Sequence, residues 1–262
     1  WTITTAPPDT LGNLPSDPNA TPLLTDTPER EIGRYYTLLV VGIDQLNANT
    51  DTIMLVRYDA VEYKANIISI PRDTLVNVSY PVKKINGVYS YAQGKGEDGI
   101  QALMDAVEGI CGFRPDSYVC INTEVFKTSI DTLGGVFFEV PVDMNYDDYS
   151  DQNNDGVTDY VFSIHVQKGY QLLNGENALG VFRFRQNNDG TGYAMGDIER
   201  LETQHALIKA VAQQGLQLKN ITKLIEIAGV VYNDSETNMT NGNLQWYASE
   251  FLKMSMEDIN IS

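Results

Sequence analysis

The sequence has few of the residues from which common catalytic centres are built. It contains two cysteines and two histidines among 262 residues, and the histidines, His165 and His205, lie forty positions apart. It has no Gly-x-Ser-x-Gly motif and no Walker phosphate-binding loop, which argues against a serine hydrolase and a P-loop nucleotidase. The His and Cys residues also lack the spacing of a zinc site. We therefore look for the chemistry of this chain among its carboxylate and cationic side chains.

Basic residues are scarce as well. There are 18 Lys and Arg against 35 Asp and Glu, for a formal net charge of −17. Nucleic-acid binding depends on a basic surface that displaces counterions, so this class of function is excluded. Adsorption to anionic membrane surfaces is disfavoured for the same reason. An acidic protein can still bind a phosphate if its few arginines come together in one place.

The two cysteines, Cys111 and Cys120, are too few for a disulfide-built scaffold. Whether the two form a disulfide is left open by the sequence. Cys120 lies in the strand-like run 117–121, where a buried free thiol is the better expectation. No hydrophobic run is long enough to cross a bilayer.

Composition divides the chain into an arm and a domain. Residues 1–33 are rich in Thr and Pro and lack apolar periodicity, which predicts a flexible arm or linker. The rest, 34–262, has apolar runs of strand type that alternate with segments of helical periodicity, and this pattern predicts one α/β domain layered around a central sheet. The expected strands are 36–43, 52–58, 64–70, 117–121 and 136–140, and the expected helices are 98–111, 124–133, 175–182, 197–216, 221–231 and 244–254.

Charged residues gather where the first three predicted strands begin or end. Asp44 follows the first strand, Asp51 precedes the second, and Arg72 and Asp73 follow the third after Pro71. Ligands of open α/β sheets bind in the crevice outside the carboxyl ends of the strands. Asp44 and Arg72 are therefore placed for ligand binding.

A second group of charged residues follows in the last third of the chain. Arg183 and Arg185 are two residues apart and would share a face of an extended segment. Asp197, Arg200 and Gln204 are spaced i, i+3 and i+7 and would share a face of a helix. Arginines suit bidentate phosphate binding, and paired carboxylates suit a magnesium ion that shares phosphate oxygens. Together the two groups predict a pyrophosphate site.

Several segments, in order, resemble one known family. They are LLVVGIDQLNANTDTIMLVRYDAVEYKANIISIPRDTLV, KINGVYSYA, FKTSIDTLGGVFFEVPVDMNY, KGYQLLNGENALGVFRFR and GDIERLETQ, and the resemblance runs from about residue 36 to about residue 214. The family is the LytR–CpsA–Psr catalytic domain. The resemblance implies an α-β-α domain with a central mixed sheet, which transfers a glycopolymer such as teichoic acid or capsule from a polyprenyl-pyrophosphate carrier to peptidoglycan. It also implies an N-terminal membrane anchor outside this sequence and a place on the extracytoplasmic face of a Gram-positive cell membrane.

The resemblance also assigns residue roles. It implies that Asp44 and Asp51 hold Mg²⁺ (or Mn²⁺) and that Asp197 is a candidate general base. The pyrophosphate ligands that it implies are Arg72, Lys84, Arg183, Arg185, Arg200 and Gln204. The catalytic set adds Asp73 and Asp197 to the arginines.

The sequence departs from the family pattern in two places. The loop QNNDGTGYAMG between Arg185 and Asp197 is longer than usual, and Thr203 stands where an arginine commonly precedes the glutamine. The first departure predicts different contacts to polymer or acceptor, and the second predicts the loss of one phosphate contact.

A separate motif has the oxygen spacing of a calcium loop, D-x-N-x-D-G-x-x-D, formed by Asp151, Asn153, Asp155 and Asp159. Phe162 occupies the twelfth position, where a calcium loop has a bidentate Glu. A polar hairpin loop is the alternative. A calcium ion here would be structural.

Three other functions remain open. The same site could hydrolyse the pyrophosphate, with water in place of the sugar hydroxyl. It could bind lipid phosphates without catalysis, as an accessory or regulatory protein. The charges could also belong to the surface of an extracellular interaction domain.

Overall fold

The computed structural model describes residues 33–43, 50–150, 159–218 and 221–262, which form two compact units. The first unit comprises the described residues of Trp1–Thr123 together with Ala228–Ser262, and the second comprises Glu124–Ile227. The predicted arm over 1–33 lies, apart from Gly33, outside the described residues. One domain over 34–262 stays a prediction.

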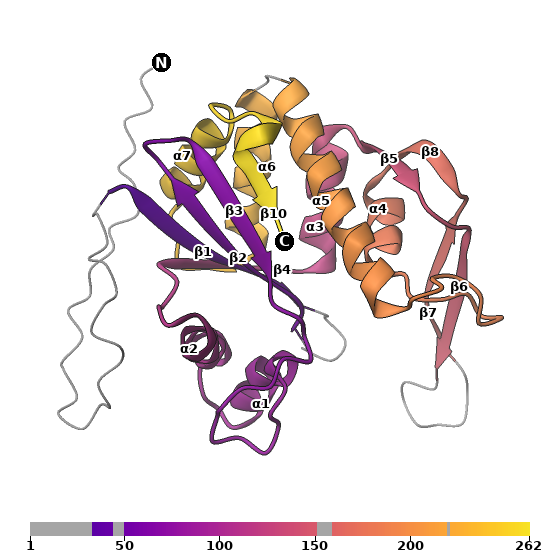
Figure 1. Cartoon of the computed structure of the whole chain (residues 1–262), viewed down its shortest axis with the longest axis horizontal. Helices are drawn as coiled ribbons and strands as arrows, with labels where there is room; N and C mark the ends of the chain where they lie inside the picture. Colours follow the sequence, from indigo (N-terminus) through magenta and orange to yellow (C-terminus); the bar gives the residue numbers. More distant parts are fainter. Residues whose placement is uncertain (1–32, 44–49, 151–158, 219–220) are drawn as a thin grey trace. The chain divides into compact units, whose positions relative to one another are not determined.

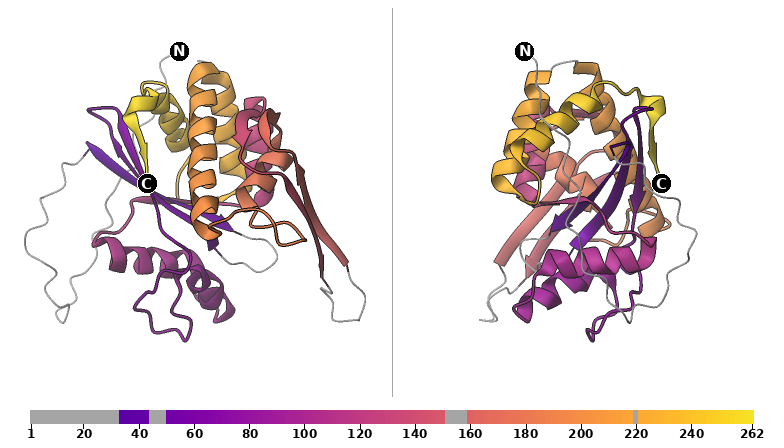
Figure 2. Two further views of the ribbon diagram at one scale, coloured as in Figure 1. Left: turned by 45° about the vertical axis from the view of Figure 1, so that its right-hand side comes forward. Right: turned by 90° about the vertical axis from the view of Figure 1, so that its left-hand side faces the viewer.

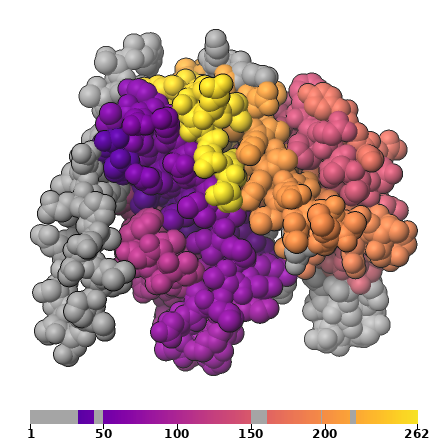
Figure 3. Space-filling model, in the orientation of Figure 1, coloured from indigo at the N-terminus to yellow at the C-terminus, as the bar shows by residue number. Residues whose placement is uncertain are grey.

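The first unit is built on a six-stranded mixed sheet in the order β10-β3-β2-β1-β4-β9 (Figure 1). The central strand β1 is antiparallel to β2 and parallel to β4, and β10 adds to β3 in parallel. In Figure 3 the yellow C-terminal segment lies beside β3, as this pairing requires. The strands are β1 (Tyr35–Ile43), β2 (Thr50–Asp59), β3 (Lys64–Ser69), β4 (Ser117–Ile121), β9 (Glu236–Thr237) and β10 (Ile259–Ile261).

Both faces of this sheet are covered because its central strands are apolar on both sides. Leu39, Val41 and Ile53 pack against α1 (Val88–Gly94) and α2 (Gly99–Cys111) (Figure 2). On the opposite face, the cross-strand pair Tyr36 and Tyr58 packs against α7 (Asn241–Phe251). The predicted α-β-α layering around a mixed sheet is thereby confirmed.

A buried carboxylate joins α7 to the sheet. Glu250 is only 6% exposed, and its two oxygens accept hydrogen bonds from the Tyr58 hydroxyl at 2.8 Å and from Lys253 Nζ at 2.6 Å. Burial and the adjacent Glu250 carboxylate raise the pKa of Tyr58 well above its ordinary value, so the phenol remains a donor. Trp246 adds an edge-to-face contact with Tyr36 at 4.9 Å between ring centroids.

The second unit consists of helices and two separate two-stranded sheets. Strands β5 and β8 pair antiparallel, and β6 and β7 form an antiparallel ribbon with a bulge between Asp148 and Tyr149 (Figure 2). The elements are α3 (Thr123–Leu133), β5 (Val136–Val140), β6 (Met144–Ser150), β7 (Asp159–Val166), β8 (Gly169–Leu173), α4 (Gly175–Arg183), α5 (Asp197–Leu218) and α6 (Ile221–Asp234). Helices α3 and α6 each run past the boundary of the unit.

The core of this unit surrounds α4. Ala178 and Val181 of α4 are fully buried among residues of β5, β7 and α5. The helix begins at Gly175, whose N–H donates to Asp131 Oδ1 at 2.7 Å, and the Asn174 side chain caps its first turn. The position of Arg183, the last residue of α4, is therefore set by a well-packed helix.

All eleven predicted elements are present, with ends shifted by up to three residues. The elements not predicted are α1, β6, β7, β8 and the short strands β9 and β10. Strand β6 (MNYDDYS) has few apolar residues, and on its partner β7 the bulged residue Val161 interrupts the alternation that identifies a strand.

Both cysteines are free thiols in the first unit, Cys120 buried and Cys111 half-buried. Burial raises the pKa of Cys120 to about 12, which leaves little reactive thiolate at neutral pH. The expectation of a buried free thiol at Cys120 is confirmed. None of the helices within the described ranges has both the length and the hydrophobicity of a membrane span.

Two glycines give opposite predictions for the same substitution. A Cβ at Gly175 would collide with the backbone of Lys127, whereas a Cβ at the exposed Gly109, inside α2, would meet nothing within 4 Å. We expect Gly175→Ala to lower the free energy of unfolding by about 1–3 kcal/mol. We expect Gly109→Ala to raise it by about 0.5–1 kcal/mol. Urea denaturation of both variants measures the difference, and an equal effect of the two would contradict the packing described here.

Candidate functional site

A β-bulge sets the direction of Asp51 at the start of β2. Gly42 lies opposite Thr52 and Ile43 opposite Thr50, so Asp51 is the extra residue on its strand. Bulges redirect side chains and are common beside functional sites. Thr50 is completely buried, and its hydroxyl donates to the carbonyl of Asn86 at 3.2 Å. The bulge therefore places Asp51 at the surface, anchored by a buried neighbour.

Arg72 reaches Asp51 from the segment that follows β3. Its Nη1 donates to Asp51 Oδ1 at 2.9 Å, with 25% of the arginine side chain and 45% of the aspartate side chain exposed. Arg72 Nε is buried and donates to none of the residues that the structure describes. A buried N–H without a partner carries a free-energy cost that an anionic ligand can relieve.

Backbone pairing holds Asp73 and Lys84 next to this pair. The Asn86 N–H donates to the Arg72 carbonyl at 3.1 Å, and Leu75 forms a bridge with Lys84. Lys84 Nζ lies 3.0 Å from Asp73 Oδ1, and both side chains are half exposed. The structure thus forms two ion pairs from four predicted residues, Asp51–Arg72 and Asp73–Lys84, which adjoin in the chain at Arg72 and Asp73 and which we call the Asp51 cluster.

The predicted metal ligands are only partly described. Asp44 lies outside the described residues, and Asp51 Oδ1 accepts from Arg72. Within the described ranges, no three His, Cys, Asp or Glu residues are grouped closely enough to hold a metal ion. Magnesium is usually bound through one or two carboxylates together with substrate phosphates, and the exposed Asp51 carboxylate fits that mode.

The second unit carries the other predicted phosphate ligands. Arg183 ends α4, with its guanidinium carbon 4.7 Å from the centre of the Phe162 ring. Phe184 is 1% exposed and inserted into the core, and Arg185 is exposed. The two arginines therefore flank a buried aromatic anchor. The helix continues through Arg183, one residue beyond the prediction.

Helix α5 contains the remaining predicted residues, and its helical conformation is confirmed. Gln204 Nε2 donates to the carbonyl of Phe182 at 2.9 Å, which fixes the backbone directly before Arg183. Arg200 is half-buried. Asp197 is the first residue of α5, and its side chain is outside the described part of the structure.

Thr203, the departure from the family pattern, is a buried residue. It is 7% exposed, and its hydroxyl donates to the Glu199 carbonyl one turn earlier at 2.8 Å. The hydrogen-bonding capacity of the side chain is thus used inside α5, which gives the position a packing role.

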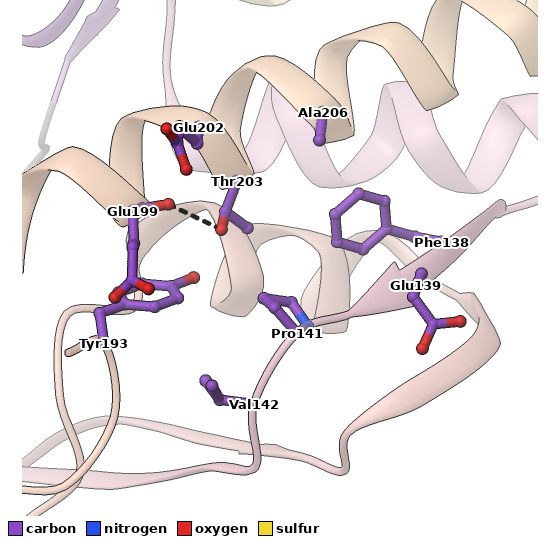
Figure 4. A pocket seen from close by; sticks show the side chains of 9 residues that line it. All are labelled: Phe138, Glu139, Pro141, Val142, Tyr193, Glu199, Glu202, Thr203 and Ala206. Carbon is purple, nitrogen blue, oxygen red and sulfur yellow. Dashed lines mark hydrogen bonds between the residues drawn. The ribbon is translucent and has the colours of Figure 1, made fainter. Parts of the chain in front are cut away.

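Thr203 also lines a cavity of about 320 Å³ between the end of β5 and the start of α5 (Figure 4). None of the predicted phosphate ligands lines it, and its charged residues are all acidic. In Figure 4 the carboxylates of Glu139 and Glu202 lie on opposite sides and do not converge. This cavity is therefore unsuited to a pyrophosphate.

The predicted calcium loop lies almost entirely outside the described residues. This holds for Asp151, Asn153 and Asp155, whereas Asp159 begins β7 and its side chain is not described. The loop connects β6 to β7, which pair as a hairpin. Calcium binding stays a prediction.

Sequence reasoning missed two residues that support the site, Thr50 and Phe184. Thr50 carries no charge and precedes Asp51 in a polar stretch, so only its burial shows its role. Phe184, between two arginines, gave a usable signal, because in an extended segment it would point to the face opposite both charged neighbours.

Comparison with known proteins adds the following. The sequence profile of the LytR_cpsA_psr family matches residues 21–262. An uncharacterized Staphylococcus aureus protein, SAOUHSC_00997, is 29% identical over 216 residues, which are 82% of this chain and 48% of that protein. The Bacillus subtilis polyisoprenyl-teichoic acid–peptidoglycan teichoic acid transferase TagU is 28% identical over 221 residues, which are 82% of this chain and 64% of that protein. The chain thus spans about half to two thirds of the length of these relatives.

Among solved structures, the crystal structure of B. subtilis TagV superimposes with a TM-score of 0.64 at 25% sequence identity. The match covers 87% of this chain and 83% of the TagV chain. The architecture described above is therefore that of a known fold.

The Asp51 cluster is exposed, so its ion pairs contribute little to stability. Exposed pairs contribute about 0–1 kcal/mol. We expect Asp51→Asn and Lys84→Gln each to change the free energy of unfolding by less than about 1 kcal/mol. Urea denaturation measures this, with Glu250→Gln as the contrasting buried carboxylate. A loss above about 3 kcal/mol in either cluster variant would show that the cluster is structural.

Proposed function

The chain belongs to the LytR–CpsA–Psr family, and on this premise we propose that it transfers a glycopolymer from a polyprenyl-pyrophosphate carrier to peptidoglycan. The observation that carries the proposal is the Asp51 cluster, an exposed group of carboxylates and cations held by a bulge and a backbone bridge. The activity for which TagU is named, transfer of teichoic acid to peptidoglycan, supports the same type of reaction for this chain. The polymer is proposed to be teichoic acid, capsule or a similar wall glycan.

In this proposal Arg72 is the main pyrophosphate ligand of the first unit. It is already oriented by Asp51, and a quarter of its side chain is exposed, so the guanidinium can still donate to a phosphate oxygen. Lys84 adds a second positive charge next to Asp73. By their match to the family motifs, Arg183, Arg185, Arg200 and Gln204 are also proposed as pyrophosphate ligands.

We propose that Asp44 and Asp51 hold Mg²⁺ or Mn²⁺. A bound divalent ion would act as a Lewis acid that neutralises charge on the phosphate oxygens. The ion pair with Arg72 orients the Asp51 carboxylate, so that a free oxygen of Asp51 can face the ligand. Structural calcium at Asp151, Asn153, Asp155 and Asp159 remains a separate proposal.

The reaction is an attack of a wall-sugar hydroxyl on the phosphorus that carries the glycan. A new O–P bond forms, the bond from that phosphorus to the bridging oxygen breaks, and the lipid leaves as its monophosphate. Arginines near the phosphates stabilise the charge that develops on the leaving group. The hydroxyl proton passes to a carboxylate, for which Asp197 and Asp73 are the candidates.

Localisation follows from the substrates. A carrier lipid lies in the membrane and peptidoglycan lies outside it, so we propose that the domain works on the extracytoplasmic face of a Gram-positive cell membrane. An N-terminal anchor helix outside this sequence would hold it there.

Hydrolysis is the second candidate, because the Asp51 cluster is open to water. Lys84 and Asp73 are each more than half exposed, so a water molecule can reach the phosphates as readily as a sugar hydroxyl. Free glycan phosphate, without attachment to the wall, would identify this activity. A purely regulatory lipid-phosphate binder would release neither product.

Arginine substitutions test the site. We expect Arg72→Ala and Arg183→Ala to lower the transfer of a lipid-pyrophosphate glycan to peptidoglycan by roughly 10²–10³-fold, because each removes charge stabilisation from the leaving phosphate. Arg114→Ala is the matched control, since Arg114 follows α2 in the chain and pairs with Asp105 and Glu108 of that helix. Full activity in both site variants would contradict the assignment.

Removal of divalent metal tests whether the transfer reaction requires a metal ion. We expect EDTA to abolish transfer and added Mg²⁺ to restore it. Asp51→Asn should raise the Mg²⁺ concentration for half-maximal rate by roughly ten- to a hundredfold. Asp105→Asn, which alters an exposed carboxylate paired with Arg114, should leave this concentration unchanged. Transfer that persists in EDTA would remove the metal from the proposal.

A further inference from the structure

The loop after Arg185 is attached to the outer edge of β6 by two asparagine side chains. Asn188 Oδ1 accepts from the Asp147 N–H at 2.7 Å, and its Nδ2 donates to the Asp147 carbonyl at 2.9 Å. Asn187 Oδ1 accepts from the Asn145 N–H at 2.6 Å, and its Nδ2 donates to the Asp143 carbonyl at 3.2 Å. Each amide thus pairs with the backbone as a neighbouring strand would.

The loop has a defined internal structure of its own. Gln186 forms a bridge with Gly192, and the Asn187 N–H donates to the Thr191 carbonyl at 2.7 Å. Gly192 has a φ of +135°, and a Cβ there would press against Gln186 and the ring of Phe184. The extra length of this loop relative to the family pattern is therefore folded into a tight turn.

Arg185 lies between two fixed points. On one side Phe184 is buried in the core and contacts the Tyr193 ring edge-to-face at 5.3 Å. On the other side Gln186 is bridged and Asn187 is bonded to β6. An arginine has a long side chain with considerable rotamer entropy, so a rigid backbone narrows the directions that the side chain can take.

We propose that Asn187 and Asn188 are positioning residues that hold the backbone of Arg185 in place for binding a pyrophosphate. The proposal rests on the proposed function, because it presumes that Arg185 contacts this ligand. Asparagine suits the task because its planar amide has one donor and one acceptor at the spacing of a peptide group. Aspartate would face the Asp147 carbonyl with a second acceptor, and alanine would remove both bonds.

A double-mutant cycle between Asn188 and Arg185 tests the proposal. The probe is geranylgeranyl pyrophosphate, and its affinity is measured by calorimetry for the wild type, Asn188→Ala, Arg185→Ala and the double variant. We expect Asn188→Ala to weaken binding about three- to tenfold. In the Arg185→Ala background the same substitution should have no further effect, since the residue it positions is absent.

The controls separate positioning from general destabilisation. Asn260→Ala removes an exposed asparagine whose side chain contacts Asn66 at 3.5 Å in the first unit, and it should leave affinity unchanged. Asn188→Asp should weaken binding in both backgrounds, because it also adds a negative charge. Thermal unfolding of each variant shows whether the protein remains folded.

The outcomes are distinct. Unchanged affinity in Asn188→Ala with a clear loss in Arg185→Ala would overturn the positioning role and leave the proposed function intact. An equal loss from Asn188→Ala in both backgrounds would show a merely structural contact and would also overturn it. Unchanged affinity in Arg185→Ala would remove Arg185 from the proposed pyrophosphate site, and the positioning role would fall with it.

Discussion

Strand β1 is hydrogen-bonded along both edges, to β2 on one side and to β4 on the other, and the first unit depends on this double pairing. On one face of the sheet Leu39 and Val41 pack against α1 and α2, and on the other face Tyr36 packs against α7. The bulge at Asp51 lies where the pairing of β1 with β2 ends, between the pairs Gly42–Thr52 and Ile43–Thr50. The end of the central strand is therefore also the place where Asp51 reaches the surface of the proposed site.

Much of the fold could be predicted from the sequence, because its central strands are buried on both faces and its main helices have clear apolar stripes. The β6–β7 ribbon could not, since β6 (MNYDDYS) has only a few apolar residues. Its inward residues, Met144 and Ile164, are buried by α4 and α5. Tertiary packing, which no local pattern shows, determines such a ribbon.

The residues of the candidate site could likewise be predicted only in part. Asp51, Arg72 and Asp73 could be found because charged residues at the ends of apolar strands are conspicuous in a sequence. The support for Arg183 and Arg185 could not be found, because it consists of amide-to-backbone hydrogen bonds from Gln204, Asn187 and Asn188. These bonds join residues up to 44 positions apart and have no local signature.

The hydrogen bonds from the Asn187 and Asn188 side chains to β6 have a consequence for association between molecules. An exposed strand edge with unpaired N–H and C=O groups is a template for strand addition by another chain, and hence for aggregation. On the outer edge of β6, the N–H groups of Asn145 and Asp147 and the carbonyl of Asp147 are already occupied by the side chains of Asn187 and Asn188. A foreign strand would have to displace both asparagines before it could pair there. The long loop thus also protects a polar ribbon from intermolecular β-sheet formation.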